Sequence, residues 1–213
     1  MIYEVRTYNL KPHSLPEVEM RFGEAYEKRK EYSELAAIWR TEIGSLNQII
    51  HVWPYKDLEE RNRIRATSAK GGGGWPPKFA EFVTTQFSDI MMPFAFSPEL
   101  KPGKIGPYFE MRTDTYASGE LPKLTKVWEK ALPVRQKFGP VYAVWYSELG
   151  GLNKFVHVYP YPTLDALSET RAKERASGMW PASMVAKKEG LPDYQLLSQE
   201  SKILMPLAFS PLQ

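Results

Sequence analysis

The sequence of 213 residues contains no cysteine and only three histidines. Without cysteine, disulfides, thiolate zinc sites and cysteine nucleophiles are excluded. No segment approaches the roughly 20 consecutive apolar residues that a membrane-spanning helix needs. The net charge is only +3, with acidic and basic residues evenly mixed, so composition gives no basis for nucleic-acid binding.

The opening segment MIYEVRTY carries a Glu and an Arg and alternates in polarity. It lacks the basic start and the apolar stretch of a signal peptide, which favours a cytoplasmic protein without a membrane partner. Apolar residues make up 43% of the chain and charged residues 25%, which is enough apolar material for a packed globular core.

The chain repeats itself with an offset of 106 residues. His51 in NQIIHVWPY matches His157 in NKFVHVYPY, and YEVRT near the start matches FEMRT. The pattern W-x-x-E-x-G-x-L-N occurs in both copies, as do the endings MPFAFSP and MPLAFSP. Two tandem domains, 1–98 and 108–213, are therefore predicted, joined by a linker at 99–107 that is rich in Pro, Gly and Lys.

Each copy shows the same succession of apolar periodicities. In the first copy, alternation predicts strands at 2–9, 36–43, 48–53 and 88–96, and helical spacing predicts helices at 15–33, 57–68 and 76–87. This β-α-β-β-α-β order is typical of a ferredoxin-like α+β domain, with an antiparallel sheet and helices on one face. The second copy can cover the other face, so a pseudo-dimer within one chain is expected. The sequence leaves open whether the chain also forms a homo-oligomer.

On these motifs, each copy resembles the NIPSNAP family of the dimeric α+β barrel superfamily. The resemblance covers nearly the whole chain and implies that the two ferredoxin-like domains pack sheet to sheet as one barrel. It implies no particular enzyme activity, because the family has no shared catalytic signature. The wider superfamily includes cofactor-free monooxygenases and haem-binding enzymes.

Alternation also predicts which side chains share a sheet face. Tyr3 and Val5 form an apolar face, expected to pack under the helices. The opposite face is expected to line the barrel interior, with Glu42 and Glu148 beside it if the hairpin loop has an even length. The residues of this polar face are Glu4, Arg6, His51 and Trp53, with Glu110, Arg112, His157 and Tyr159 in the second copy.

Several of these residues allow two interpretations. His51 and His157 could act as general bases, although a structural histidine in a half-buried strand is the favoured alternative. Arg6 and Arg112 could clamp a carboxylate, or they could pair with neighbouring glutamates. No metal site or cofactor is expected, since no histidine pair has ligand spacing. The run GGGG at 71–74 lacks the phosphate-loop pattern and is predicted to be a flexible loop.

The sequence therefore predicts a NIPSNAP-like protein that binds a small organic molecule, anionic or not, between its two sheets. An interaction scaffold without enzymatic activity is one alternative. A cofactor-independent monooxygenase-like enzyme is the other.

Overall fold

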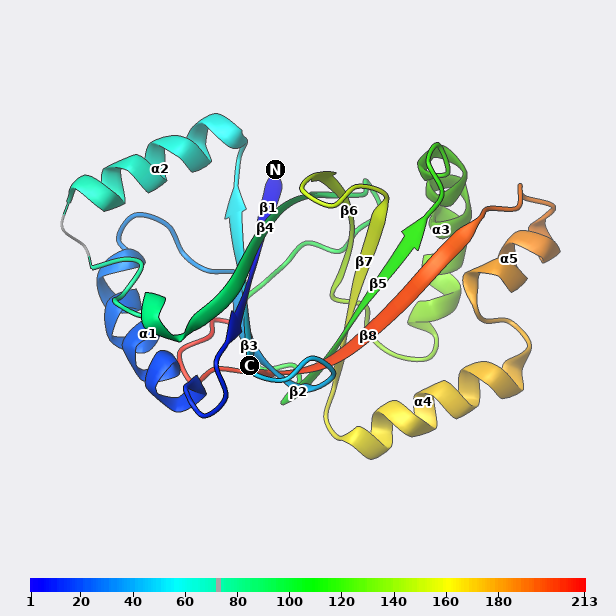
Figure 1. Ribbon diagram of the computed structural model, residues 1–213. Coiled ribbons are helices and arrows are strands. Elements are labelled where there is room, and N and C mark those ends of the chain that lie inside the picture. The colour runs from blue at the N-terminus through cyan, green and yellow to red at the C-terminus, as the bar shows by residue number, and fades with distance from the viewer. Residues whose placement is uncertain (72–73) are drawn as a thin grey trace.

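The computed structural model describes residues 1–71 and 74–213, and its strands form one closed antiparallel barrel in the order β1-β3-β2-β8-β5-β7-β6-β4 (Figure 1). The first half (residues 1–98) comprises β1 Ile2–Leu10, α1 Leu15–Arg29, β2 Ala37–Ile43, β3 Gln48–Tyr55, α2 Leu58–Lys70, the 3₁₀ helix η1 Ala80–Phe82, and β4 Val83–Pro93. The second half (residues 108–213) comprises β5 Tyr108–Tyr116, α3 Leu121–Gln136, β6 Ala143–Leu149, β7 Lys154–Tyr161, α4 Leu164–Ser177, α5 Ala182–Glu189 and β8 Leu196–Pro206.

The β-α-β-β-α-β order and the α+β fold class are confirmed in both halves. The helix predicted at 76–87 is wrong for the first half, because only the short η1 forms there and β4 begins early, at Val83. The segment VTTQF is rich in β-branched and aromatic residues, which favour an extended strand. It pairs with β1, with Thr7 opposite Phe87. The loop predicted at 71–74 falls partly on residues 72–73, which lie outside the described residues.

The two halves close the barrel by pairing with each other. β4 pairs with β1 of its own half and with β6 of the second half, and β8 likewise joins β5 to β2. At the two seams, Pro93 lies opposite Trp145 and Trp39 lies opposite Pro206. Each four-stranded sheet therefore satisfies its edges with strands of the other half, so the described strands leave no open edge for aggregation.

The repeated endings MPFAFSP and MPLAFSP cross from one half to the other. Phe94 packs in the apolar cluster of the second half, and Leu207 in that of the first. The hydroxyl oxygen of Ser97 accepts the backbone N–H of Val144 at 3.1 Å, and Ser210 does the same for Ile38 at 3.1 Å. The AFSP motif thus pairs a backbone donor of the opposite half, which explains why its serine recurs.

The glycine of W-x-x-E-x-G-x-L-N starts each β-hairpin loop. Gly150 has a φ of +100°, and a Cβ there would lie 2.0 Å from the Oδ1 of Asp89. Both the backbone conformation and the close approach therefore require glycine at this position.

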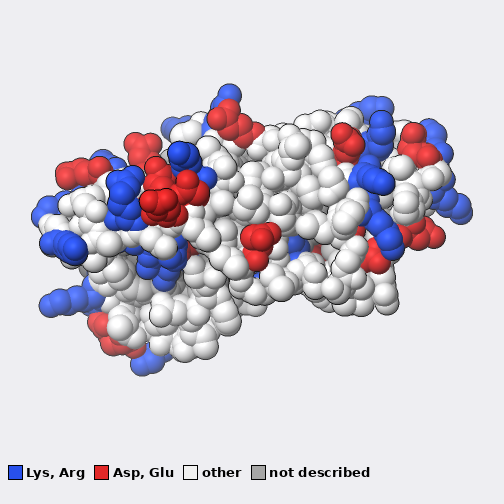
Figure 2. Space-filling view, turned by 90° about the horizontal axis from the view of Figure 1, so that it is seen from above, with Lys and Arg blue, Asp and Glu red and all other residues white. Residues whose placement is uncertain are grey.

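The two sheet faces are the reverse of the sequence prediction. The barrel interior is apolar and draws on both halves, with Tyr3 stacked on Trp145 at 4.9 Å between ring centroids. The polar set faces outward, under the helices that flank the barrel on either side (Figure 1). Exposed charges also gather over these two helical ends, and the surface between them is mostly uncharged (Figure 2).

The physical reason for this correction lies in the helices. The core of this barrel is filled by apolar side chains of both halves, so a Glu4 carboxylate buried among them would have no counter-charge beside it. α2 carries arginines that reach Glu4 from the helix side. Among the described residues, no helix combines the length and the apolar character needed to cross a membrane.

Candidate functional site: an arginine-lined cavity in the first half

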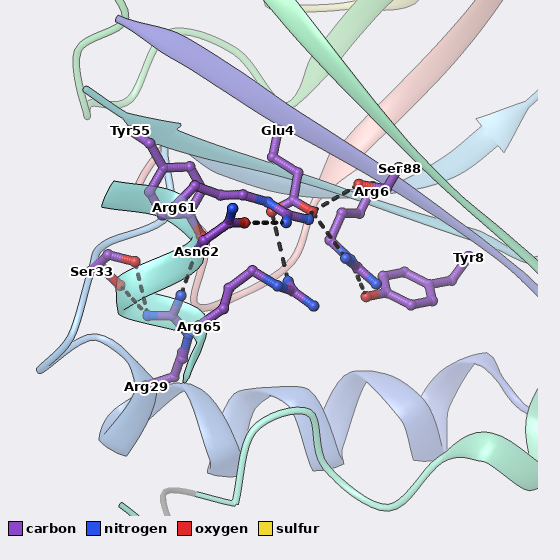
Figure 3. A network of polar contacts seen from close by, with 10 residues as sticks. All are labelled: Glu4, Arg6, Tyr8, Arg29, Ser33, Tyr55, Arg61, Asn62, Arg65 and Ser88. Carbon is purple, nitrogen blue, oxygen red and sulfur yellow. Dashed lines mark hydrogen bonds and ion pairs between the residues drawn. The ribbon is translucent and has the colours of Figure 1, made fainter. Parts of the chain in front are cut away.

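Glu4 of β1 is the centre of a buried polar network between the sheet and α2 (Figure 3). Its Oε1 accepts hydrogen bonds from Arg6 at 3.0 Å, Arg61 at 2.6 Å and Ser88 at 2.7 Å. Its Oε2 lies 3.7 Å from Arg65. Arg61 and Arg65 are one helical turn apart on α2, so both side chains lie on the face toward the sheet.

This network keeps the Glu4 carboxylate ionised. Burial alone would raise the pKa of Glu4, but the hydrogen bonds from Arg61 and Ser88, with the charges of Arg6 and Arg65, lower it to about 2. Arg6 also donates from Nε to the hydroxyl of Tyr8 at 2.6 Å. Of the two interpretations of Arg6 from the sequence, the structure therefore shows the ion pair with Glu4.

Arg29, at the end of α1, is a buried cation that the sequence interpretation did not single out. Its side chain donates to the Ser33 hydroxyl at 2.8 Å and to the Tyr55 hydroxyl at 3.4 Å, and it lies 4.3 Å from the centre of the Trp53 ring. It is only 2% exposed, and among the described residues no carboxylate forms an ion pair with it. Burial, with a smaller effect of Arg65, lowers its pKa.

A cavity of about 100 Å³ opens beside Arg29. Its wall includes Ser68, a buried residue whose hydroxyl has no hydrogen-bond partner among the described residues. Four arginines and one glutamate surround this region, which gives a formal charge of 4 − 1 = +3. The lining residues are Arg6, Tyr8, Arg29, Arg65, Ser68, Ala69, Trp75 and Pro76.

A second, more apolar hollow of about 410 Å³ adjoins this cavity. The two share Arg6, Tyr8 and Pro76, and the hollow continues over Phe79 and Val83. A charged chamber next to an apolar one suits a molecule with an anionic head and a short apolar body.

His51 lies beneath the same helices but has no polar partner. It is fully buried, and its ring packs against Phe22 at 4.7 Å and Tyr8 at 5.0 Å between centroids. Neither ring nitrogen has a hydrogen-bond partner in the described chain. Burial, with the nearby charge of Arg6, lowers the pKa of His51 to about 3, so the ring is neutral at physiological pH.

His157 has the polar neighbours that His51 lacks. Its Nδ1 lies 2.5 Å from the hydroxyl of Tyr159, and its Nε2 lies 3.4 Å from the carboxylate of Asp114. Burial lowers the pKa of His157 although Asp114 opposes the shift. The sites of the two histidines are therefore chemically different, and a catalytic role for either one stays a prediction.

The second half contains an equivalent network around Glu110, with a different balance of positive and negative charges. Glu110 accepts hydrogen bonds from Ser201 at 2.9 Å and from Arg171. Arg135 lies over the ring of Tyr159, 4.0 Å from its centre. Burial acts to raise the pKa of Asp114, but the hydrogen bonds from His157 and Gln199 and the nearby charge of Arg112 together lower it.

Glu42 and Glu148 lie apart from both networks. The register places Ile38 opposite His51, as an even hairpin loop requires. Glu42 nevertheless sits at the exposed end of its strand, 3.8 Å from Arg40. Glu148 lines a separate cavity of about 250 Å³ with Tyr116, Tyr146 and Phe155 among its other walls.

At the predicted location between the sheets, a hollow opens at a mouth of the barrel. This hollow of about 250 Å³ has apolar walls that include Val5 and Ile50. The charges at its rim are paired, with Lys154 2.9 Å from Asp89. It therefore lacks the uncompensated charge that distinguishes the arginine-lined cavity. No cluster of three or more metal-ligating side chains occurs in the part of the chain that the structure describes.

Two signals in the sequence point to the residues that were missed. Arg29 and Arg135 obey the same 106-residue offset as the histidines, on helices that the periodicity had predicted. At the equivalent positions Ser68 and Glu174, by contrast, the copies differ in charge.

Three known proteins resemble this chain in fold or in sequence. An anthrone oxidase-like protein of known structure superimposes with a TM-score of 0.61 over 100% of this chain and 94% of its own, at 9% identity. Human protein NipSnap homolog 3A is 28% identical over 100% of this chain and 86% of its own length. The protein NipSnap homolog of Dictyostelium discoideum is 27% identical over 97% of this chain and 87% of its own.

The fold is therefore that of the dimeric α+β barrel proteins, built here within a single chain. The NIPSNAP family model matches residues 3–98 and again 109–211, so the chain belongs to the NIPSNAP family.

Proposed function

We propose that this protein binds a small organic anion in the arginine-lined cavity of its first half. The observation that carries the proposal is Arg29, a cation that is 2% exposed and has no carboxylate partner among the described residues. An uncompensated buried charge is costly, and a bound anion would remove that cost. The site lies between sheet and helices, in a different place from the one predicted from sequence.

The volumes of the cavity and the adjoining hollow limit the size of the ligand. The cavity of about 100 Å³ accommodates a charged head group, and the adjoining hollow of about 410 Å³ takes an apolar body. Arg6 and Arg65 face the head group from the sheet and from α2, while Phe79 and Val83 contact the body. An organic acid with a short aliphatic or aromatic body fits these requirements.

Calorimetry in a low-chloride buffer tests this proposal with four probes that each contain six carbon atoms. Hexanoate, hexyl phosphate and hexanesulfonate carry a negative charge, whereas hexanamide is neutral. We expect an anion to bind and hexanamide not to bind. Arg29→Met should weaken anion binding at least about tenfold, since a charge-assisted hydrogen bond contributes roughly 1.5–3 kcal/mol.

Arg63→Met is the matched control, because Arg63 lies on α2 with a side chain that is 67% exposed. It should bind the anions as the wild type does. Equal affinity for hexanamide and the anions would contradict the proposal, as would anion binding that survives Arg29→Met in a folded protein. The scaffold and the monooxygenase-like enzyme stay predictions, with no contact in the site that favours either.

A further inference from the structure

The two halves contain the same buried arginine in the same setting. Arg29 and Arg135 are 106 residues apart, at the ends of α1 and α3, and each is 2% exposed. Each donates from Nη2 to a tyrosine of the third strand in its half, Arg29 to Tyr55 at 3.4 Å and Arg135 to Tyr161 at 3.0 Å. The second half can therefore serve as a template for the first.

Within the described parts of the chain, only the second half provides this arginine with a counter-charge. Glu174 of α4 places its Oε1 2.9 Å from the Nε of Arg135. The equivalent residue on α2 is Ser68, which lines the cavity of about 100 Å³. The second half thus holds a carboxylate where the first half has a small hydroxyl group and open volume.

The other charged residues around the two sites also make the first half more positive than the second. Arg61 has Leu167 as its counterpart, and Tyr8 has Asp114. The second-half set is balanced, with three arginines and three carboxylates: Arg112, Arg135, Arg171, Glu110, Asp114 and Glu174. The first-half set has four arginines and one carboxylate: Arg6, Arg29, Arg61, Arg65 and Glu4.

We infer that the cavity beside Ser68 is a carboxylate site, and that the head group of the ligand lies where Glu174 places its own carboxylate in the second half. The inference rests on the proposed function for the existence of a natural ligand. Glu174 brings one planar carboxyl group to Arg135, near Arg112 and Arg171, and these three arginines are the counterparts of Arg29, Arg6 and Arg65. The Ser68 hydroxyl has no hydrogen-bond partner among the residues that the structure describes, and it can donate a hydrogen bond to a carboxylate oxygen.

Ser68→Glu should place a side-chain carboxylate of the protein itself in the site. The new carboxylate should pair with Arg29, raise the melting temperature by about 3 °C or more, and weaken hexanoate binding at least about tenfold. Ala66→Glu is the matched control, since it adds the same charge on the exposed face of α2. It should leave both the melting temperature and hexanoate binding near the wild-type values.

Glu174→Ser should open the equivalent site in the second half. The variant should melt at a lower temperature than the wild type, and acetate should restore part of the loss. Calorimetry should then find a second hexanoate site. Glu169→Ser removes an exposed carboxylate from the same helix and should show neither effect.

The outcomes separate this inference from the proposed function. The inference would be overturned if the Ser68→Glu variant melted at no higher temperature than Ala66→Glu. It would also be overturned if acetate stabilised the Glu174→Ser variant no more than Glu169→Ser. In the wild type, hexanoate should bind more tightly than hexyl phosphate, and the reverse order would also overturn it. If the wild type binds none of the hexyl probes while both variants behave as expected, the carboxylate site is supported and the proposed function alone fails.

Discussion

Glu4→Gln is expected to lower the free energy of unfolding by about 3 kcal/mol at pH 7, because Glu4 is, among the described residues, the only carboxylate that pairs with Arg6, Arg61 and Arg65. The value is at the low end for a broken buried ion pair, since the side chains of Arg61 and Arg65 are 22% and 39% exposed. Urea denaturation of the folded variant measures the loss. The same change should tighten anion binding, because the cavity gains net positive charge.

The pH dependence follows from the lowered pKa of Glu4. The folded value of about 2 lies below the ordinary value of 4.5, so the carboxylate stabilises the fold above pH 4.5. That contribution is lost as the pH falls from 4.5 towards 2. Glu4→Gln should therefore show a shallower loss of stability than the wild type across this window.

Glu110→Gln is the matched comparison in the second half. Its arginines keep Asp114 and Glu174 as counter-charges, so the loss should be clearly smaller than for Glu4→Gln. An equal loss in both variants would show that the charge difference between the halves has no energetic consequence.

Trp145→Ala should cost about 3–5 kcal/mol, as expected when a large aromatic side chain is removed from a packed core. Trp145 is fully buried in the barrel interior and stacks on Tyr3 of the other half. Since this apolar cluster is shared by both halves, the wild type should unfold in one transition. Chemical denaturation followed by fluorescence and circular dichroism measures both quantities.

Phe87→Ala provides the control for this substitution, because Phe87 lies at the barrel mouth and is 57% exposed. It should cost less than about 1 kcal/mol. A Trp145→Ala variant as stable as Phe87→Ala would contradict the packed interior and would favour a ligand chamber between the sheets.

The repeat and the apolar periodicities predicted the β-α-β-β-α-β order of each half, and the family resemblance implied the barrel. Alternation along β1 separated Tyr3 from Glu4, but it could not tell which face is inside, since both faces are covered. The answer depends on α2, which brings Arg61 and Arg65 over Glu4. Helical periodicity locates such a helix in the chain, whereas its position over the sheet is a property of tertiary packing.

The candidate site was only partly predictable for the same reason. Glu4 and Arg6 were found because they share a strand and repeat in the second copy. Arg29 and Ser68 come from two different helices, and only the fold brings them to one cavity. The decisive difference, Ser68 in place of Glu174, is visible in the sequence but acquires meaning once Arg135 is seen to pair with Glu174.

The most direct test of the central claim is a crystal soaked in bromide, with the anion located by its anomalous scattering. We expect a peak in the cavity between Arg29 and Ser68, and no peak beside Arg135, where Glu174 already supplies the negative charge. A first-half cavity without bromide, or equal peaks beside both arginines, would contradict the central claim.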